Sequence, residues 1–247
     1  MSVLLLRLSG PLQSWGESSR FLRRSTRWEP TKSGIVGLIA AALGRTREEP
    51  VEDLAQLELG VRVDQRGEML RDFQTERSMD EKVVMPLTNR YYLADAKFLV
   101  ALGGPKELLD VIEKALMAPK WPLYLGRRSC PPDMPVVLGL KSEYSDVRDA
   151  LAKEPWIAAD WYRRRHKSMN LEVACDARDG EACESQADYP LGFSQEGRHY
   201  ACRPVYRYRI ANPSLVPGEE PASTNARRGK PIRNEDYQLV HDPMGFF

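Results

Sequence analysis

In the first 145 residues, segments with the hydrophobic pattern of β-strands alternate with segments that have the pattern of α-helices. Short apolar or alternating runs, each closed by glycine, proline or polar residues, are typical of β-strands. They predict strands at Val3–Leu8, Leu59–Asp64, Met69–Phe73, Ala96–Leu102 and Val136–Leu140. Two longer runs have apolar residues three and four positions apart, which predicts one helix within Pro30–Arg45 and one between Gly104 and Pro119.

The first predicted helix has recognisable ends. Thr31 or Ser33 can cap its N-terminus, and Gly44 can close it in a left-handed conformation. Its sequence, PTKSGIVGLIAAALGR, is apolar on nearly every face, which predicts burial against a sheet, with Gly37 allowing a close backbone approach. The second helix is amphipathic, with an apolar stripe formed by Leu108, Leu109, Ile112, Ala115 and Leu116.

The predicted order is strand, helix, strand, inserted hairpin, strand, helix, strand. This order indicates an α+β protein with a ferredoxin-like (RRM-like) βαββαβ core, in which both helices lie on one face of an antiparallel sheet. We expect this domain to span residues 1–145, with the inserted hairpin at about 74–92. Residues 146–247 are expected to form a smaller β-rich region, with a strand over Arg203–Ile210 and an extended tail after Pro213.

The formal net charge of +1 hides an uneven distribution of charge. The first 47 residues hold eight basic and two acidic side chains, whereas 172–196 holds seven acids and one arginine. Further basic runs lie at 127–128, 163–167 and 227–233. Any one run is ordinarily solvated surface, but together they favour one face that holds a polyanion and another that meets protein neighbours.

Several classes of protein do not fit this sequence. The longest apolar run, Ile35–Leu43, is far shorter than the ~20 residues that cross a bilayer, and the N-terminal run lacks a basic leader and a cleavage site. We therefore expect a cytoplasmic protein without a membrane partner. The four cysteines lie far apart with no C-x-x-C pair, so we expect no structural metal and no cofactor.

Three segments have the composition of phosphate- or base-binding loops. The helix start at Thr31, Lys32 and Ser33 offers amide groups, hydroxyls and an ammonium to a phosphate, although a plain capped helix explains it as well. No glycines precede Lys32, so an NTPase loop is rejected. The turn 124–131 contains a glycine, two arginines and a serine between prolines, which suits RNA or an ordinary surface turn. Trp15, beside Gly16, either stacks on a base or fills the edge of the core.

Catalysis has little support in this sequence. Metal-free RNA cleavage needs a general base, most often a histidine, and His166 is the one histidine set within a basic run. The same run serves equally well as a set of phosphate contacts.

Three blocks follow one another in the order MSVLLLRLSGPLQSWG with the later Arg27, PTKSGIVGLIAAALGR and PLYLGRRSCP. Together they resemble the Cas-five family of CRISPR-associated proteins in its type I-E form. The resemblance implies a non-catalytic RNA-binding protein with a ferredoxin-like core and a hairpin "thumb". It would cap the 5′ handle of the CRISPR RNA in a Cascade complex. Carried over by block, the RNA-binding candidates are Ser14, Trp15, Gly16, Arg27, Thr31, Lys32, Ser33, Gly126, Arg127, Arg128 and Ser129, with Arg77 and Arg90 on the thumb.

The partners that the resemblance implies are the CRISPR RNA, the backbone and large subunits of the complex and, through the complex, target DNA. We expect the first helix start and the diarginine turn to converge on one RNA backbone. Relatives in another subtype cleave precursor RNA, so a metal-independent endoribonuclease using His166 is the alternative function. A protein scaffold whose basic loops meet acidic partners is the third.

Overall fold

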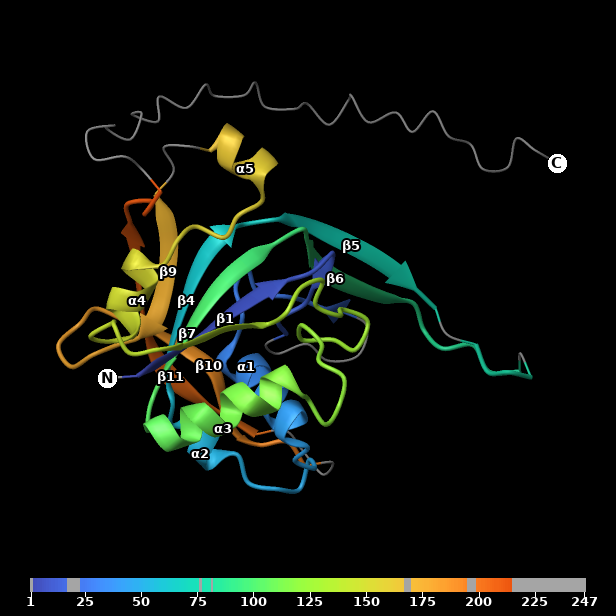
Figure 1. Cartoon of the computed structure of the whole chain (residues 1–247). Helices are drawn as coiled ribbons and strands as arrows, with labels where there is room; N and C mark the ends of the chain where they lie inside the picture. The colour runs from blue at the N-terminus through green and yellow to red at the C-terminus, as the bar shows by residue number, and fades with distance from the viewer. Residues whose placement is uncertain are drawn as a thin grey trace.

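The computed structural model describes residues 2–16, 23–75, 77–80, 82–166, 170–194 and 199–214. Its main body is a seven-stranded antiparallel sheet in the spatial order β10-β11-β9-β4-β7-β1-β8 (Figure 1). These strands are β1 Val3–Ser9, β4 Glu58–Gln65, β7 Lys97–Gly103, β8 Val137–Lys141, β9 Leu171–Asp176, β10 Glu184–Gly192 and β11 His199–Ile210. A smaller sheet contains β2 Leu12–Gln13, β3 Arg23–Arg24, β5 Glu68–Gln74 and β6 Thr88–Ala94. The predicted strands and the α+β class are confirmed.

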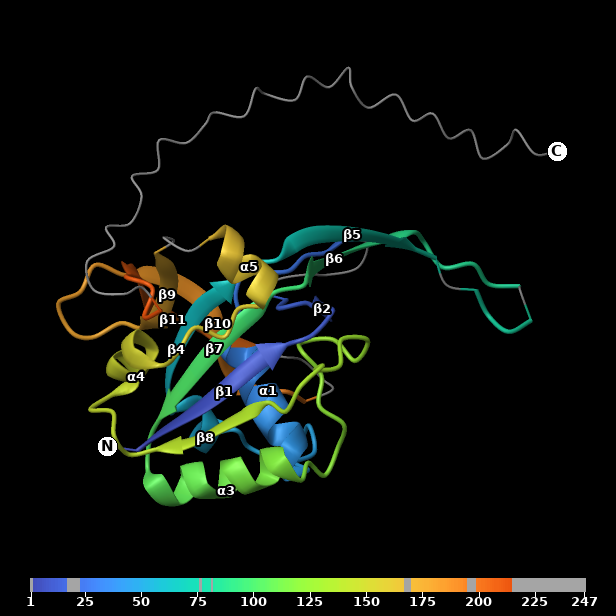
Figure 2. The same ribbon diagram turned by 45° about the horizontal axis from the view of Figure 1, so that its top comes forward.

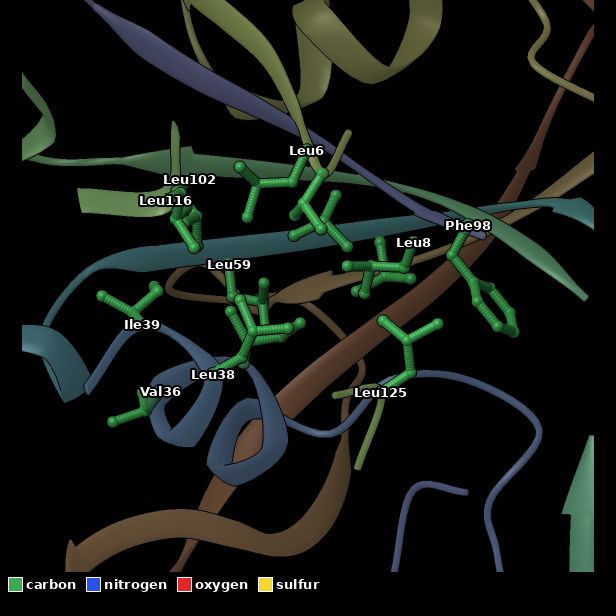
Figure 3. Close-up of a cluster of buried hydrophobic side chains, with 14 of the residues drawn as sticks. Leu6, Leu8, Val36, Leu38, Ile39, Leu59, Phe98, Leu102, Leu116 and Leu125 are labelled. Atoms are coloured by element: carbon green, nitrogen blue, oxygen red, sulfur yellow. The ribbon is translucent and has the colours of Figure 1, made fainter. Parts of the chain in front are cut away.

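Strand β1 is mostly apolar because both of its faces are covered. Leu4, Leu6 and Leu8 point to the face that carries the two long helices, and Val3 and Leu5 point to the opposite face. Figure 3 shows Leu6 and Leu8 meeting residues of the first helix. A strand buried on both faces gains from apolar residues on both, which explains the consecutive apolar residues Val3–Leu6.

Helix α1, Lys32–Leu43, lies against this sheet as predicted. The Thr31 side chain accepts a hydrogen bond from the Gly34 amide, and Gly44 ends the helix with a φ of 75°. The expected close approach at Gly37 is wrong, because a Cβ atom there would stand 3.8 Å from Phe193, an ordinary contact. The close approach is at Gly34, where a Cβ atom would lie 2.8 Å from the Trp15 ring.

Helix α3, Lys106–Met117, packs beside α1 on the same face of the sheet (Figure 2). Its predicted apolar stripe is confirmed, since Leu109, Ile112 and Leu116 are buried. Three short helices were not predicted: α2 Glu52–Ala55, α4 Val147–Lys153 and α5 Asp160–Arg165. Helix α4 covers the face opposite to α1 and α3. No helix among the described residues is long and apolar enough to cross a membrane.

The C-terminal strands continue the main sheet. Strand β9 pairs with the outer edge of β4, and β11 and β10 follow it. The predicted strand over Arg203–Ile210 is confirmed as part of β11. The expected tail after Pro213 lies almost entirely outside the described residues.

Strands β5 and β6 form an antiparallel hairpin that projects from the body (Figures 1 and 2). The pairing extends from Glu68 opposite Ala94 to Gln74 opposite Thr88. Large apolar side chains in the connection between the strands are exposed to solvent: Met79, Val83, Val84, Met85 and Leu87.

Candidate nucleic-acid interface

Trp15 is a core residue rather than an exposed stacking platform. It is 0% exposed, and its indole Nε1–H donates to Gln13 Oε1 at 3.1 Å. The Gln13 amide donates in turn to the backbone of Leu8 and Ala96, which ties the loop to two strands. The sequence allowed Trp15 either to stack on a base or to fill the edge of the core, and the structure shows that it fills the core. Its neighbour Gly16 is exposed at the surface.

The turn 124–131 packs directly on the backbone of this loop. The Ser14 amide donates to the Leu125 carbonyl at 3.1 Å, and the Ser14 hydroxyl donates to the Tyr91 carbonyl at 3.0 Å. Gly126 has a φ of 85°, and a Cβ atom there would overlap the Ser14 carbonyl group. Only glycine therefore fits, and the first and third sequence blocks meet at this contact.

The two arginines of the turn differ in exposure. One Nη of Arg127 donates to the Arg24 carbonyl at 2.8 Å, and its guanidinium stands 4.8 Å from the centre of the Tyr92 ring. The other Nη is buried and has no hydrogen-bond partner among the described residues. Arg128 and Ser129 are exposed. Arg127 thus holds the turn in place through the Arg24 carbonyl and the Tyr92 ring.

Further arginines gather at the base of the hairpin. Strand β3 runs parallel to β6, with Arg23 opposite Asn89 and Arg24 opposite Arg90. Because paired residues project to the same face of a sheet, Arg24 and Arg90 lie together near Arg127. Arg23 stands 5.2 Å over the Tyr91 ring on the other face. We call Arg23, Arg24, Arg90, Arg127 and Arg128 the hairpin-base cluster.

Sequence reasoning did not single out Arg23 and Arg24. They entered only the count of basic residues in the first 47 positions, and that excess was the signal that pointed to them. A strand of two residues is too short to leave a periodic pattern. Both side chains are exposed, so they are accessible to a polyanion.

The start of α1 does not offer free groups to a phosphate, in contrast to the expectation. The Lys32 amide donates to Asp188 Oδ2 at 2.8 Å, and the Lys32 ammonium pairs with Asp176 at 3.0 Å. Arg203 bridges the same two carboxylates. Two internal carboxylates thus occupy the amide and the ammonium of Lys32, the groups that were expected to bind a phosphate together with the diarginine turn.

The other predicted residues near α1 have supporting contacts. Ser33 Oγ lies 3.3 Å from Thr31 Oγ1, which is itself the helix cap. The Arg27 amide donates to the Trp15 carbonyl at 2.8 Å, and the Arg27 guanidinium lies 3.5 Å from Glu29. These residues fix the geometry of the loop around Trp15.

Arg77 lies apart from the hairpin-base cluster. It is exposed near the tip of the β5–β6 hairpin, in an isolated bridge with Val84. The hairpin therefore separates the two predicted hairpin arginines, with Arg90 at its base and Arg77 at its end.

His166 is held against α5. Its Nδ1 lies 3.0 Å from the Tyr162 carbonyl, and its ring stacks on the Tyr162 ring with centroids 4.0 Å apart. None of these contacts involves the hairpin-base cluster. Within the described part of the chain, no group of three or more His, Cys, Asp or Glu side chains is placed to hold a metal ion.

Comparisons with known proteins agree with these features. The family model described as CRISPR-associated protein (Cas_Cas5) matches residues 3–206. The CRISPR system Cascade subunit CasD of Escherichia coli K12 is 36% identical over 182 residues, which cover 65% of this chain and 80% of that protein. A crystal structure of a Cas protein superposes with a TM-score of 0.67 at 40% identity, covering 85% of this chain and 95% of the other. A chain of a CRISPR RNA-guided surveillance complex gives a TM-score of 0.66 at 31% identity, covering 89% and 95%. Since the family model spans most of its length, the chain belongs to the Cas5 family of CRISPR-associated proteins.

Proposed function

We propose that the protein is a CRISPR-RNA-binding subunit of a Cascade-type surveillance complex and that it caps the 5′ handle of the RNA. Membership of the family and the likeness to CasD support this assignment. The observation that carries the RNA contact is the hairpin-base cluster, which brings arginines from three distant parts of the sequence together. A dense set of guanidinium groups is the feature that a phosphate backbone requires.

The order of the strands supports a ferredoxin-like core with an inserted thumb. Strands β8, β1, β7 and β4 are adjacent in that order, and α1 and α3 lie together on one face. This is the arrangement of a ferredoxin-like βαββαβ core, to which β9, β11 and β10 add further strands. The β5–β6 hairpin, inserted between the second and third strands of that core, then corresponds to the thumb.

We divide the predicted RNA-binding residues, together with Arg23 and Arg24, into two groups. The exposed or partly exposed groups that contact RNA are the arginines of the hairpin-base cluster, with Gly16, Ser129 and, on the hairpin, Arg77. The residues that hold this surface in place through internal contacts are Ser14, Trp15, Arg27, Thr31, Lys32, Ser33 and Gly126. The backbone and large subunits of the complex are the proposed protein partners, and target DNA is met through the complex.

A test of this surface is the double substitution Arg24→Ala and Arg128→Ala, because both side chains are exposed and their removal leaves the internal contacts intact. The matched control is Arg47→Ala with Lys106→Ala, which removes the same charge from exposed positions elsewhere. We expect weaker binding of labelled CRISPR RNA and a slope of log K against log salt reduced by about 1.4, or roughly 0.7 per lost contact. An affinity and slope equal to those of the control would refute the assignment.

We also propose that binding occurs without cleavage. The His166 ring stacks on Tyr162 and shares no contact with the hairpin-base cluster. A general base must reach the proton that it removes. Incubation of the purified protein with precursor RNA in EDTA is expected to leave the RNA intact, whereas a discrete product that disappears in His166→Ala would establish the endoribonuclease instead.

A further inference from the structure

Helix α5 is fixed firmly to the end of the main sheet. The Ala159 amide donates to Gln65 Oε1 at 3.0 Å, and the Arg163 guanidinium donates inward to the carbonyls of Ala158 and Trp156. Tyr162 is buried, edge-on to the Trp156 ring at 6.2 Å between centroids. The helix is therefore a supported element whose outer face is presented in a defined orientation.

The outer face of α5 combines an indole with two guanidinium groups. Trp161 is 43% exposed, and Arg164 and Arg165 are exposed on the same side because they follow it by three and four positions. The Arg165 guanidinium stands 5.8 Å from the centre of the Trp161 ring. Within the described part of the chain, neither Arg164 nor Arg165 pairs with a carboxylate.

A second indole and guanidinium lie beside this helix. Arg66 lies in the turn between β4 and β5, beside Tyr162. Figures 1 and 2 both show α5 next to that turn. The Arg66 guanidinium stands 5.0 Å over the ring of Trp28, which is 41% exposed. Arg66 thus links a second exposed indole, Trp28, to the region of α5.

The charge of this surface favours an anion. Its acids are Glu172, which lies 3.9 Å from Arg66 and pairs with Arg209 at 3.0 Å, and Asp160 in the first turn of α5. The guanidinium groups of Arg164 and Arg165 remain in excess of these acids. Exposed indoles accept the faces of nucleobases, and guanidinium groups accept phosphates, so a single strand of nucleic acid satisfies both features.

We propose that this α5 surface, defined by Trp28, Arg66, Trp161, Arg164 and Arg165, is a second binding site for single-stranded nucleic acid. It shares no residue with the hairpin-base cluster. Bases stack on the two indoles, and the arginines neutralise phosphates between them. The site binds without regard to sequence, because it offers ring faces and charge rather than a fixed set of hydrogen-bond donors and acceptors.

The test uses the full chain and a labelled oligouridylate, measured by fluorescence anisotropy over a series of salt concentrations. All variants carry Arg24→Ala and Arg128→Ala, which weakens binding at the hairpin base to the same extent in each. In this background, Trp161→Ala is expected to weaken binding at least about fivefold, as loss of one stacked base implies. Arg164→Ala with Arg165→Ala is expected to lower the salt slope by about 1.4. The control, Arg47→Ala with Lys106→Ala, is expected to change neither quantity.

Every outcome decides the proposal. Oligouridylate binding that is the same in the α5 variants and in the control overturns it. So does an α5 variant that binds oligouridylate normally but fails to join the assembled complex, because that result assigns the surface to a protein partner. Neither result affects the hairpin-base assignment, which depends on the binding of CRISPR RNA by Arg24→Ala with Arg128→Ala in an otherwise unchanged chain.

Discussion

Replacement of Gly126 by alanine tests how the diarginine turn is held. Gly126 has a φ of 85°, a region in which an ordinary side chain is strained. The added Cβ atom would stand 2.7 Å from the Ser14 carbonyl carbon and closer still to its oxygen. Since the obstacle is backbone rather than a flexible side chain, the turn itself has to move.

The structure sets the size of the effect. The left-handed conformation costs a residue with a side chain about 1–2 kcal/mol. Displacement of the turn also breaks the hydrogen bond from the Ser14 amide to the Leu125 carbonyl, which contributes about 1 kcal/mol. We expect Gly126→Ala to lower the free energy of unfolding by about 2–3 kcal/mol, and Tm by roughly 2–4 °C for each kcal/mol.

Gly180→Ala provides the control for this experiment. Gly180 has a φ of 84°, but no atom lies within 4 Å of the Cβ position. Both variants therefore carry the backbone strain, and only Gly126→Ala carries the overlap. Thermal unfolding and CRISPR RNA binding of the two proteins are compared. Equal losses of stability, together with unchanged RNA binding by Gly126→Ala, would refute the packing of the turn on Ser14.

Three other substitutions test contacts described above. Asp188→Asn leaves the Arg203 guanidinium with a weakened buried partner and is expected to destabilise the fold by about 3 kcal/mol in urea unfolding. Thr31→Ala removes the α1 cap and is expected to cost about 1 kcal/mol in the same assay. A hydrogen bond from Arg148 lowers the pKa of Glu181 to about 2 from 4.5, so the stability due to this pair is present above pH 4.5 and is lost as the pH falls towards 2. Glu181→Gln is expected to flatten the pH dependence of unfolding in that interval, and an unchanged profile would contradict this cause.

Local patterns were sufficient for the long elements of the fold. The strand at Val3–Ser9 and the helix at Lys32–Leu43 are both buried, and their apolar runs and end residues mark them clearly. The amphipathic helix Lys106–Met117 was equally easy to predict from the sequence, because one of its faces meets solvent. Burial of a defined face leaves a period in the sequence, and that period is what the prediction used.

The sequence did not predict which residues the individual charged side chains contact. Lys32 pairs with Asp176, which is 144 positions away, and no local pattern indicates such a contact. The composition of the segment around Lys32 suggested a phosphate site, whereas the distant C-terminal strands supply carboxylates at the same position. The hairpin-base cluster depends likewise on a pairing of two-residue β3 with β6. Tertiary contacts of this kind decide which arginines are exposed together, so the site was predicted only in part.

The place of β9 beside β4 has a consequence for synthesis of the chain on the ribosome. Strand β4 ends at Gln65, but the strand that covers its outer edge begins only at Leu171. While the intervening segment emerges, the nascent protein carries an uncovered β edge, which invites pairing with other chains. Production of this subunit in a cell is therefore expected to be most vulnerable to aggregation during that interval, and any pause in translation between these two strands prolongs it.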